Sequence, residues 1–504
     1  MRKNLLALSI AAMVGGLSGA ANAAVITAGT TATVLEPTTT GVGHILTVPY
    51  FSTQGNNKTL LNIVNTDTVN GKAVKLRFRG AANSDDVFDI TVYLSPGDVW
   101  TADVAADAEG FSRLVTTDTS CTLPSAQDIK DANNGRFKTH RVQGGAAAQT
   151  REGYVEILNT ADIAPGTGAA GANSALYTAI KHVAGKAPCT QATMDLQEND
   201  LNTILADPNS AAVRGYTNPT GGLMANWVLV NVAGFASHSG EAVAVRANVS
   251  GGGASGAANI VWFPQTTATP TAGAVTTLTS DPLLQSAGFA SQVANYDFPD
   301  LSTPYTAPAV VGAPETQADL LANALGTTSV TNEYLTGNGF STDWVFSMPT
   351  RRYAVALNYA APAATRLMFS QDPDGAAGPL LANNRHFTAA NTSLNADGSL
   401  ACVTPGSMRG YDREENTQST FVISPDVALR LCGETTVLAF NNTGESVLGG
   451  AIARTNIKTK FNEGWFTINT AAAVASTGLP IIGFSASKVT GANLGGTWKH
   501  RTAR

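Results

Sequence analysis

The chain has 504 residues, of which 43% are hydrophobic and 13% are charged, and its formal net charge is −6. The hydrophobic share is large enough for a folded core and excludes a disordered chain. The net negative charge is poorly suited to sequence-independent binding of nucleic-acid phosphates, so no nucleic-acid partner is expected. The charged share is about half of the usual share near 25%, and such weak self-repulsion suits a protein that packs against copies of itself.

The first 23 residues are predicted to form an export signal. A short positive region (Arg2, Lys3) precedes an apolar run over 5–17, and the small residues at 21–23 fit a cleavage site. We therefore expect the mature chain to begin at Ala24 and to be exported. No later apolar run reaches about 18 residues, so no transmembrane segment is expected.

The dominant sequence pattern has a period of two, which predicts half-buried β-strands. It is clearest in KAVKLRFRGAANSDDVFDITVYL (72–94), where a turn-rich stretch separates two alternating runs and predicts an antiparallel hairpin. Similar strands are expected at 59–66, 153–160, 226–235, 241–250, 259–263, 343–348, 352–359, 421–424, 436–442 and 464–469.

The charges of this hairpin fit either a binding surface or a solvated sheet face. Basic and acidic side chains lie on or near one face of the two strands: Lys75, Arg77, Arg79, Asp85, Asp86 and Asp89. Opposite charges across strands contribute roughly 0.2–1 kcal/mol per pair, and no aromatic residue interleaves the basic ones as a stacking platform requires. We therefore favour a solvated face that neutralises itself over a basic patch for an anionic partner.

Helices are predicted to be few and short. The segment TQADLLANALG (316–326) has Thr316 placed to cap a helix and Gly326 placed to stop it. Weaker helical signals at 174–185 and 198–207 lie around Cys189, and we interpret this part of the chain as an insertion between β segments.

Together these elements predict a mainly β protein, with antiparallel β-sandwich-like (immunoglobulin-like) regions and short helical insertions. One pair of sheets is too small for a chain of this length. We therefore expect a β-rich region over 24–290, with a helical insertion around 125–215, and a second β-rich region over 291–504.

The four cysteines are Cys121, Cys189, Cys402 and Cys432. In an exported protein an even, small number indicates disulfides. Three pairings are possible, and sequence order favours Cys121–Cys189 and Cys402–Cys432 because each pair lies within one half of the chain. Metal binding by thiols needs close spacing such as Cys-x-x-Cys, which is absent.

The sequence assigns no catalytic, cofactor-binding or metal-ligating residues. A glycine-rich match at 251–256 precedes another predicted strand rather than a helix, so it is not expected to bind a dinucleotide. The segments 371–378 and 395–399 resemble calcium loops without continuing the EF-hand pattern, so turns are expected there. Calcium is the only candidate cofactor. The histidines have no ligand-like spacing.

The tryptophans offer another possible ligand site. Aromatic rings can form platforms for carbohydrate, and the chain has six candidates: Trp100, Trp227, Trp262, Trp344, Trp465 and Trp498. Most of them lie inside or at the end of alternating strands, so core packing is the favoured interpretation.

Four blocks of the chain resemble exported proteobacterial proteins called cell surface proteins. They are KTLLNIVNTDTVNGKAVKLRFRGAANSDDVFDITVYLSPGDVWTADV (58–104), NYDFPDLSTPY (295–305), TDWVFSMPTRRYAVAL (342–357) and GLPIIGFSASKV (478–489). The resemblance implies a location outside the cell or on the outer surface of a Gram-negative bacterium, and a β-rich fold. It implies no enzymatic role, and no functional residues carry over.

We therefore expect an exported structural protein of the cell surface, a subunit of a surface layer or extracellular matrix. Its expected partners are other copies and envelope polysaccharide or lipopolysaccharide, held by non-covalent contacts with calcium as a candidate bridge. The basic C-terminal residues (Lys499, Arg501 and Arg504) could serve as a tether, although a disordered end is the favoured reading. The alternative is a secreted adhesin or glycan-binding module. The third choice is a secreted enzyme whose active site is not revealed by any sequence motif.

Overall fold

The structure is a computed structural model that describes most of the chain. The described residues are 24–26, 29–131, 135–139, 141–199, 211–212, 214–234, 236–250, 256–262, 301, 305–306, 314–359, 361–369, 386–426, 428–440, 445–471, 478–489 and 495–504. The predicted export signal at 1–23 and the predicted boundary between 290 and 291 lie outside them.

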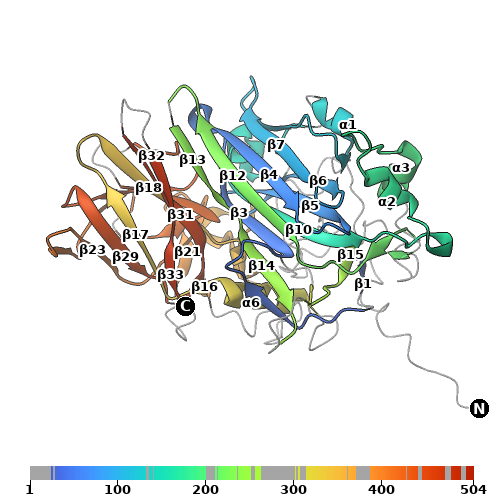
Figure 1. Cartoon of the computed structure of the whole chain (residues 1–504). Helices are drawn as coiled ribbons and strands as arrows, with labels where there is room; N and C mark the ends of the chain where they lie inside the picture. The colour runs from blue at the N-terminus through green and yellow to red at the C-terminus, as the bar shows by residue number, and fades with distance from the viewer. Residues whose placement is uncertain are drawn as a thin grey trace, which may run out of the picture.

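The protein is mainly β, as the alternating pattern predicts, and its sheets stack as β-sandwiches (Figure 1). The N-terminal half contains an eight-stranded sheet in the order β2 (Val34–Pro37), β14 (Val243–Asn248), β3 (Ile45–Ser52), β10 (Glu152–Ile163), β5 (Gly71–Gly80), β6 (Asp86–Leu94) and β9 (Cys121–Leu123), with β11 (Tyr216–Thr217) paired to β10. A five-stranded sheet covers one of its faces, in the order β13 (Ala236–Glu241), β12 (Leu223–Asn231), β4 (Lys58–Asn65), β7 (Val99–Ala106) and β8 (Ser112–Val115). A separate pair joins β1 (Ala24–Ile26) and β15 (Ile260–Trp262).

The C-terminal half contains a second pair of sheets. The six-stranded sheet has the order β25 (Val422–Ser424), β28 (Arg454–Lys458), β27 (Thr435–Phe440), β18 (Phe340–Ser347), β31 (Ile482–Val489) and β32 (Gly495–Lys499). The five-stranded sheet has the order β24 (Thr417–Gln418), β23 (Met408–Tyr411), β29 (Glu463–Asn469), β17 (Ser329–Leu335) and β33 (Arg501–Ala503). Smaller sheets pair β16 (Gly326–Thr327) with β30 (Leu479–Pro480), β19 (Val355–Leu357) with β20 (Leu367–Phe369), and β21 (Thr392–Leu394) with β22 (Ala401–Val403) and β26 (Leu431–Cys432).

The described strand pairs are antiparallel except for β27 with β28. The predicted hairpin is confirmed, because β5 pairs with β6 and Phe78 lies opposite Phe88. The basic C-terminal end is not disordered, since it forms β32 and β33 and the intervening His500 is buried.

The helices are short, as predicted. Among the described residues the α-helices are α1 (Ala126–Lys130), α2 (Ala175–Ile180), α3 (Gln191–Asn199) and α6 (Pro314–Leu325). The last begins two residues before the predicted cap Thr316 and ends at the predicted stop. Ser174 caps α2 by accepting a hydrogen bond from the backbone N–H of Tyr177. Strand β10 lies between α1 and α2, so the expected insertion around 125–215 includes a strand of the eight-stranded sheet as well as helices.

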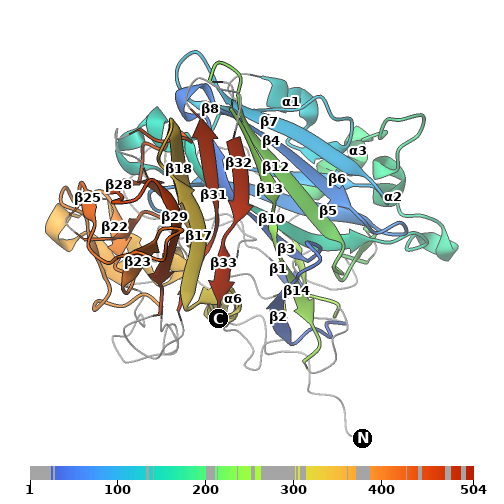
Figure 2. The same ribbon diagram turned by 60° about the vertical axis from the view of Figure 1, so that its left-hand side comes forward.

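The two halves share one hydrophobic core. The ring of Phe484 in β31 contacts that of Trp227 in β12, with centroids 4.6 Å apart. The ring of Tyr50 in β3 also lies near Phe484, with centroids 6.5 Å apart. Neighbouring residues of β18 face opposite ways: Val345 packs into this shared core and Trp344 packs into the core of the C-terminal sandwich. The central strands β18 and β27 are therefore covered on both faces, and β31 runs beside β18 (Figure 2).

Edge strands of the two halves also lie side by side. In both views β13 runs next to β32 (Figures 1 and 2). The hydroxyl of Thr497 in β32 accepts a hydrogen bond from the backbone N–H of Ser239 in β13 at 3.3 Å. These two edges therefore face each other, and neither is left open along its whole length.

Candidate functional site

The charged face of β5 is buried, not solvated. The side chains of Arg77 and Arg79 are 0% exposed and that of Lys75 is 1% exposed. The interpretation of this face as a wet sheet surface is therefore wrong. The alternation correctly separates two faces of the strand, but the polar face is covered by other parts of the fold.

The charges on this face are paired with one another. Arg77 forms an ion pair with Asp86, and Arg141 reaches the same carboxylate at 3.0 Å. Lys75 pairs with Asp89 on the neighbouring strand. The prediction that the hairpin neutralises itself is therefore confirmed, although it does so away from solvent.

The tip of the hairpin, residues 80–86, inserts into the C-terminal half. The carbonyl oxygen of Ala81 accepts hydrogen bonds from the backbone N–H groups of Glu434 and Thr435, at 2.7 and 3.1 Å. The side-chain oxygen of Asn83 accepts one from the backbone N–H of Leu357 at 3.2 Å. The segment predicted as a turn thus also contacts the C-terminal half, and Asn83 and Leu357 lie 274 positions apart in sequence.

A second group of charges completes this contact. Arg351 binds the carboxylate of Glu434 through its Nε at 2.7 Å, and the backbone N–H of Arg352 donates to the other oxygen of that carboxylate at 2.9 Å. On β10, Glu156 lies 3.2 Å from the Nε of Arg79 and accepts a hydrogen bond from the hydroxyl of Tyr154. We call residues 79–86, 154–156, 351–359 and 432–435 the ionic junction.

Burial and charge move the pKa values of the junction carboxyls in opposite directions. Burial raises the pKa of Asp85 to about 7, although the hydroxyl of Tyr359 donates to it and Arg79 and Arg141 lie nearby. Burial acts in the same direction on Asp86, but Arg77, Arg79 and Arg141 outweigh it and hold that pKa well below its usual range. The two neighbouring carboxyls thus differ in charge near neutral pH.

A second polar contact between the halves surrounds the loop 446–452. Glu152 of β10 accepts a hydrogen bond from the backbone N–H of Ala451 at 2.8 Å, and burial raises its pKa. Asp343 of β18 accepts from the backbone N–H of Leu448 at 2.9 Å, and burial raises its pKa to about 6. The side-chain amide of Asn57 donates to the carbonyl of Leu448 at 2.7 Å.

The pKa values of Asp85, Asp86, Glu152 and Asp343 are perturbed, as is typical of catalytic sites. A general acid or base must nevertheless come within hydrogen-bonding reach of a substrate. Asp85, Asp86, Glu156 and Glu434 are each at most 4% exposed, and the groups that bind them belong to the protein itself. The ionic junction therefore holds the two halves of the chain together.

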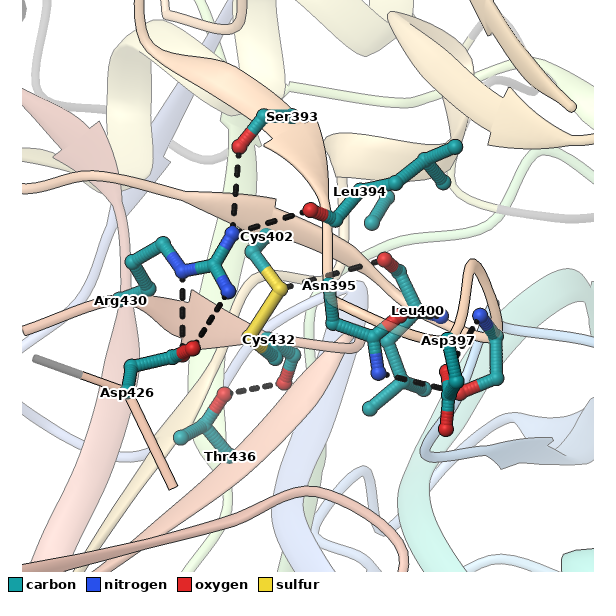
Figure 3. Close-up of a disulfide and its surroundings, with 12 residues drawn as sticks. Ser393, Leu394, Asn395, Asp397, Leu400, Cys402, Asp426, Arg430, Cys432 and Thr436 are labelled. Atoms are coloured by element: carbon teal, nitrogen blue, oxygen red, sulfur yellow. Dashed lines mark hydrogen bonds and ion pairs between the residues drawn. A yellow bond between two sulfur atoms is a disulfide. The ribbon is translucent and has the colours of Figure 1, made fainter. Parts of the chain in front are cut away.

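The disulfides join Cys121 to Cys189 and Cys402 to Cys432, the pairs favoured by sequence order. Figure 3 shows the second bond, which links β22 to β26, with Arg430 beside it. Both Nε and Nη2 of Arg430 bind the carboxylate of Asp426, at 3.0 and 2.6 Å. Since Glu434 lies two residues after Cys432, the end of β26, this bond fixes a strand at the edge of the ionic junction.

The calcium-like segment 395–399 forms a turn, as expected. The carboxylate of Asp397 accepts a hydrogen bond from the backbone N–H of Ser399 at 2.8 Å, and the side chain of Asn395 accepts one from Leu400. The other calcium-like segment, 371–378, lies outside the described residues. Within the part of the chain that the structure describes, no three His, Cys, Asp or Glu side chains are grouped to hold a metal ion.

The tryptophans divide into two groups. Trp100, Trp227 and Trp344 are buried, as core packing predicts. Trp465 and Trp498 are each 39% exposed, so core packing does not describe them. The side chain of Trp262 lies outside the described part of the chain.

Comparisons with protein-family models, curated proteins and solved structures return no match for this chain. The helices of the described residues include none with the length and apolar character to cross a membrane.

Proposed function

We propose that this chain is an exported structural protein of a bacterial cell surface, a subunit of a surface layer or extracellular matrix. The observation that carries the proposal is the ionic junction. Its most strongly perturbed ionisable groups are sealed between the two halves and bind each other, so they serve to fix the shape of the molecule. A subunit that must keep neighbouring copies in register benefits from such a fixed shape.

The blocks that resemble cell surface proteins fit this proposal. The block 58–104 contributes β4 to β7, the block 342–357 contributes β18 and residues of the junction, and the block 478–489 contributes β31. These elements pack against one another at the shared core and the junction. The sequences of these three blocks can therefore be explained by packing between the elements that they form. The resemblance supports a shared architecture.

Retention on the cell is the test of this role. The chain has a net charge of −6, so direct attraction to anionic lipopolysaccharide is unfavourable and divalent cations are the proposed bridge. Washing intact cells with a chelator should release the protein, and adding calcium back should return it or assemble it into larger particles. Electron microscopy and surface proteomics should show it among the most abundant envelope proteins.

One result would count against the structural role, and another would count against the cation bridge. A protein present in few copies per cell cannot form a continuous layer. Retention that survives chelator, but is lost in high salt, would replace the cation bridge with direct contacts of exposed basic residues such as Arg501.

A further inference from the structure

The outer face of the C-terminal five-stranded sheet carries an exposed aromatic pair. Tyr411 of β23 lies directly opposite Trp465 of β29, and their rings stack with centroids 4.1 Å apart and planes 12° apart. Phe466, which alternates with Trp465, points into the sandwich core, and Gly410, which alternates with Tyr411, lies against the ring of Phe466. The pair therefore stands on the solvent side of the sheet, and Trp465 also lies opposite Glu333 of β17.

A row of polar residues crosses the same face next to this pair. In register across the strands, Arg409 lies opposite Thr467, Thr467 opposite Thr331, and Thr331 opposite Arg501. The hydroxyl of Thr331 donates to that of Thr467 at 3.2 Å. Three strand spacings separate the ends of the row, about 14 Å in all, so the face presents hydroxyl and guanidinium groups along a line.

The charged groups around the aromatic pair form ion pairs and give no excess of positive charge. Arg413 lies 3.1 Å from Glu463 and 3.0 Å from Glu414, and Arg501 lies 3.9 Å from Glu333. A nucleic acid or an anionic lipid surface needs an excess of positive charge. A neutral ligand rich in hydroxyl groups needs both donors and acceptors, which paired guanidinium and carboxylate groups supply.

We infer that this outer face binds a neutral polysaccharide chain. The apolar C–H face of a sugar ring packs against an aromatic ring, while its hydroxyls form hydrogen bonds with the surrounding polar groups. Small-molecule sites commonly combine aromatic contacts with a few polar groups that fix the ligand's orientation. Trp and Tyr also lose little conformational entropy on binding. The aromatic pair supplies the contact area, and the neighbouring row of Thr and Arg side chains supplies direction.

This site deepens the proposed function by giving the structural subunit a place to hold envelope polysaccharide. The binding itself depends only on the outer face and is measurable with purified protein. Glycan binding that persists in a protein of low abundance would end the structural role and leave this inference standing.

The test uses affinity electrophoresis of the purified protein in native gels that contain dextran, hydroxyethylcellulose or the neutral polysaccharide fraction of a Gram-negative envelope. The wild-type protein should be retarded by at least one of the three. Trp465→Ala and Tyr411→Ala should each weaken that retardation at least tenfold. Trp498→Ala is the matched control, because Trp498 has the same exposure but lies on β32 of the other sheet, and it should bind like the wild type.

Three results would overturn the inference. The first is a wild-type protein that none of the three polysaccharides retards. The second is an equal loss of binding in Trp465→Ala and Trp498→Ala, with unfolding midpoints unchanged. The third is a change in sedimentation of the protein alone in Trp465→Ala without a change in retardation, which would make this face a contact between copies.

Discussion

At the scale of single residues, the main finding is that charged side chains of a β-strand lie in the interior. Removing water from a charge is costly unless a partner replaces it. Arg79 and Glu156 both lie fully buried and face each other from adjacent strands. Their pairing sets the positions of β5 and β10 together with the side chains that reach them from the C-terminal half.

Replacing Arg79 by Met should destabilise the protein by about 3–5 kcal/mol, because it leaves Glu156 buried without its charged partner. The double substitution Arg79→Met with Glu156→Met should be less damaging than Arg79→Met alone. Denaturant unfolding measures both changes. Arg409→Met is the control, since Arg409 is exposed on the outer face, and a cost at Arg79 no larger than at Arg409 would contradict the buried pair.

Asp85 should give the protein a measurable dependence on pH. Its pKa is about 7 in the folded protein and about 3.9 in an unfolded chain. Because the folded pKa is raised, its contribution to stability is fully present below pH 4 and is lost as the pH rises through 7. The total loss is roughly 4 kcal/mol as an upper value, at about 1.4 kcal/mol per pKa unit.

Asp85→Asn removes this titration while keeping a group that can accept the hydrogen bond from Tyr359. The free energy of unfolding of the variant, minus that of the wild type, should therefore increase between pH 4 and pH 8. Subtraction cancels other titrating groups, such as His44, whose pKa burial lowers to about 3. A difference that stays constant across this range would show that Asp85 is not held in a desolvated site.

At the scale of elements, the sequence predicts strands better than it predicts which faces are covered. Period-two alternation sorts side chains onto two faces, and this was enough to predict the hairpin of β5 and β6. Whether the polar face meets water depends on residues 351–359 and 432–435, which are remote in the sequence. The isolated Glu156 within the apolar run GYVEIL (153–158) was the available sign of a buried partner.

The exposed aromatic pair was equally hard to predict. Trp465 lies in an alternating strand, as the buried Trp344 does, so the local pattern is the same for both. Their different exposure depends on which position of the alternation turns toward the neighbouring sheet. That choice is made by the pairing of β29 with β17 and β23, which the local sequence does not specify.

The two disulfides should have different effects because they constrain different elements. Removing Cys402–Cys432 by Ala substitution should lower the free energy of unfolding of the whole protein by about 2–4 kcal/mol, since it releases β26 beside the ionic junction. Removing Cys121–Cys189 should first expose the segment 164–199 to limited proteolysis, because Cys189 ties that segment to β9. Identical cleavage of that segment with and without the bond would contradict this assignment.

At the scale of the whole molecule, the shared core joins the two halves into one cooperative unit. The core around Phe484 contains side chains from β3 and β12 as well as from β18, β27 and β31. Separating the halves would expose this apolar surface and would also break the contacts that the polar and charged groups of the junction make across the two halves. Both costs oppose unfolding of one half alone.

The protein should therefore unfold in a single transition, even though it contains two pairs of sheets. Phe466→Ala tests this, because Phe466 lies wholly within the core of the C-terminal sandwich and its loss should cost about 3–5 kcal/mol. Hydrogen exchange read by mass spectrometry should then accelerate equally in peptides from β4 and β12 and in peptides from β17 and β29. Phe484→Ala should do the same through the shared core. Faster exchange confined to β17 and β29 in Phe466→Ala would mean that the halves unfold separately, and the ionic junction would then be a docking contact between independent domains.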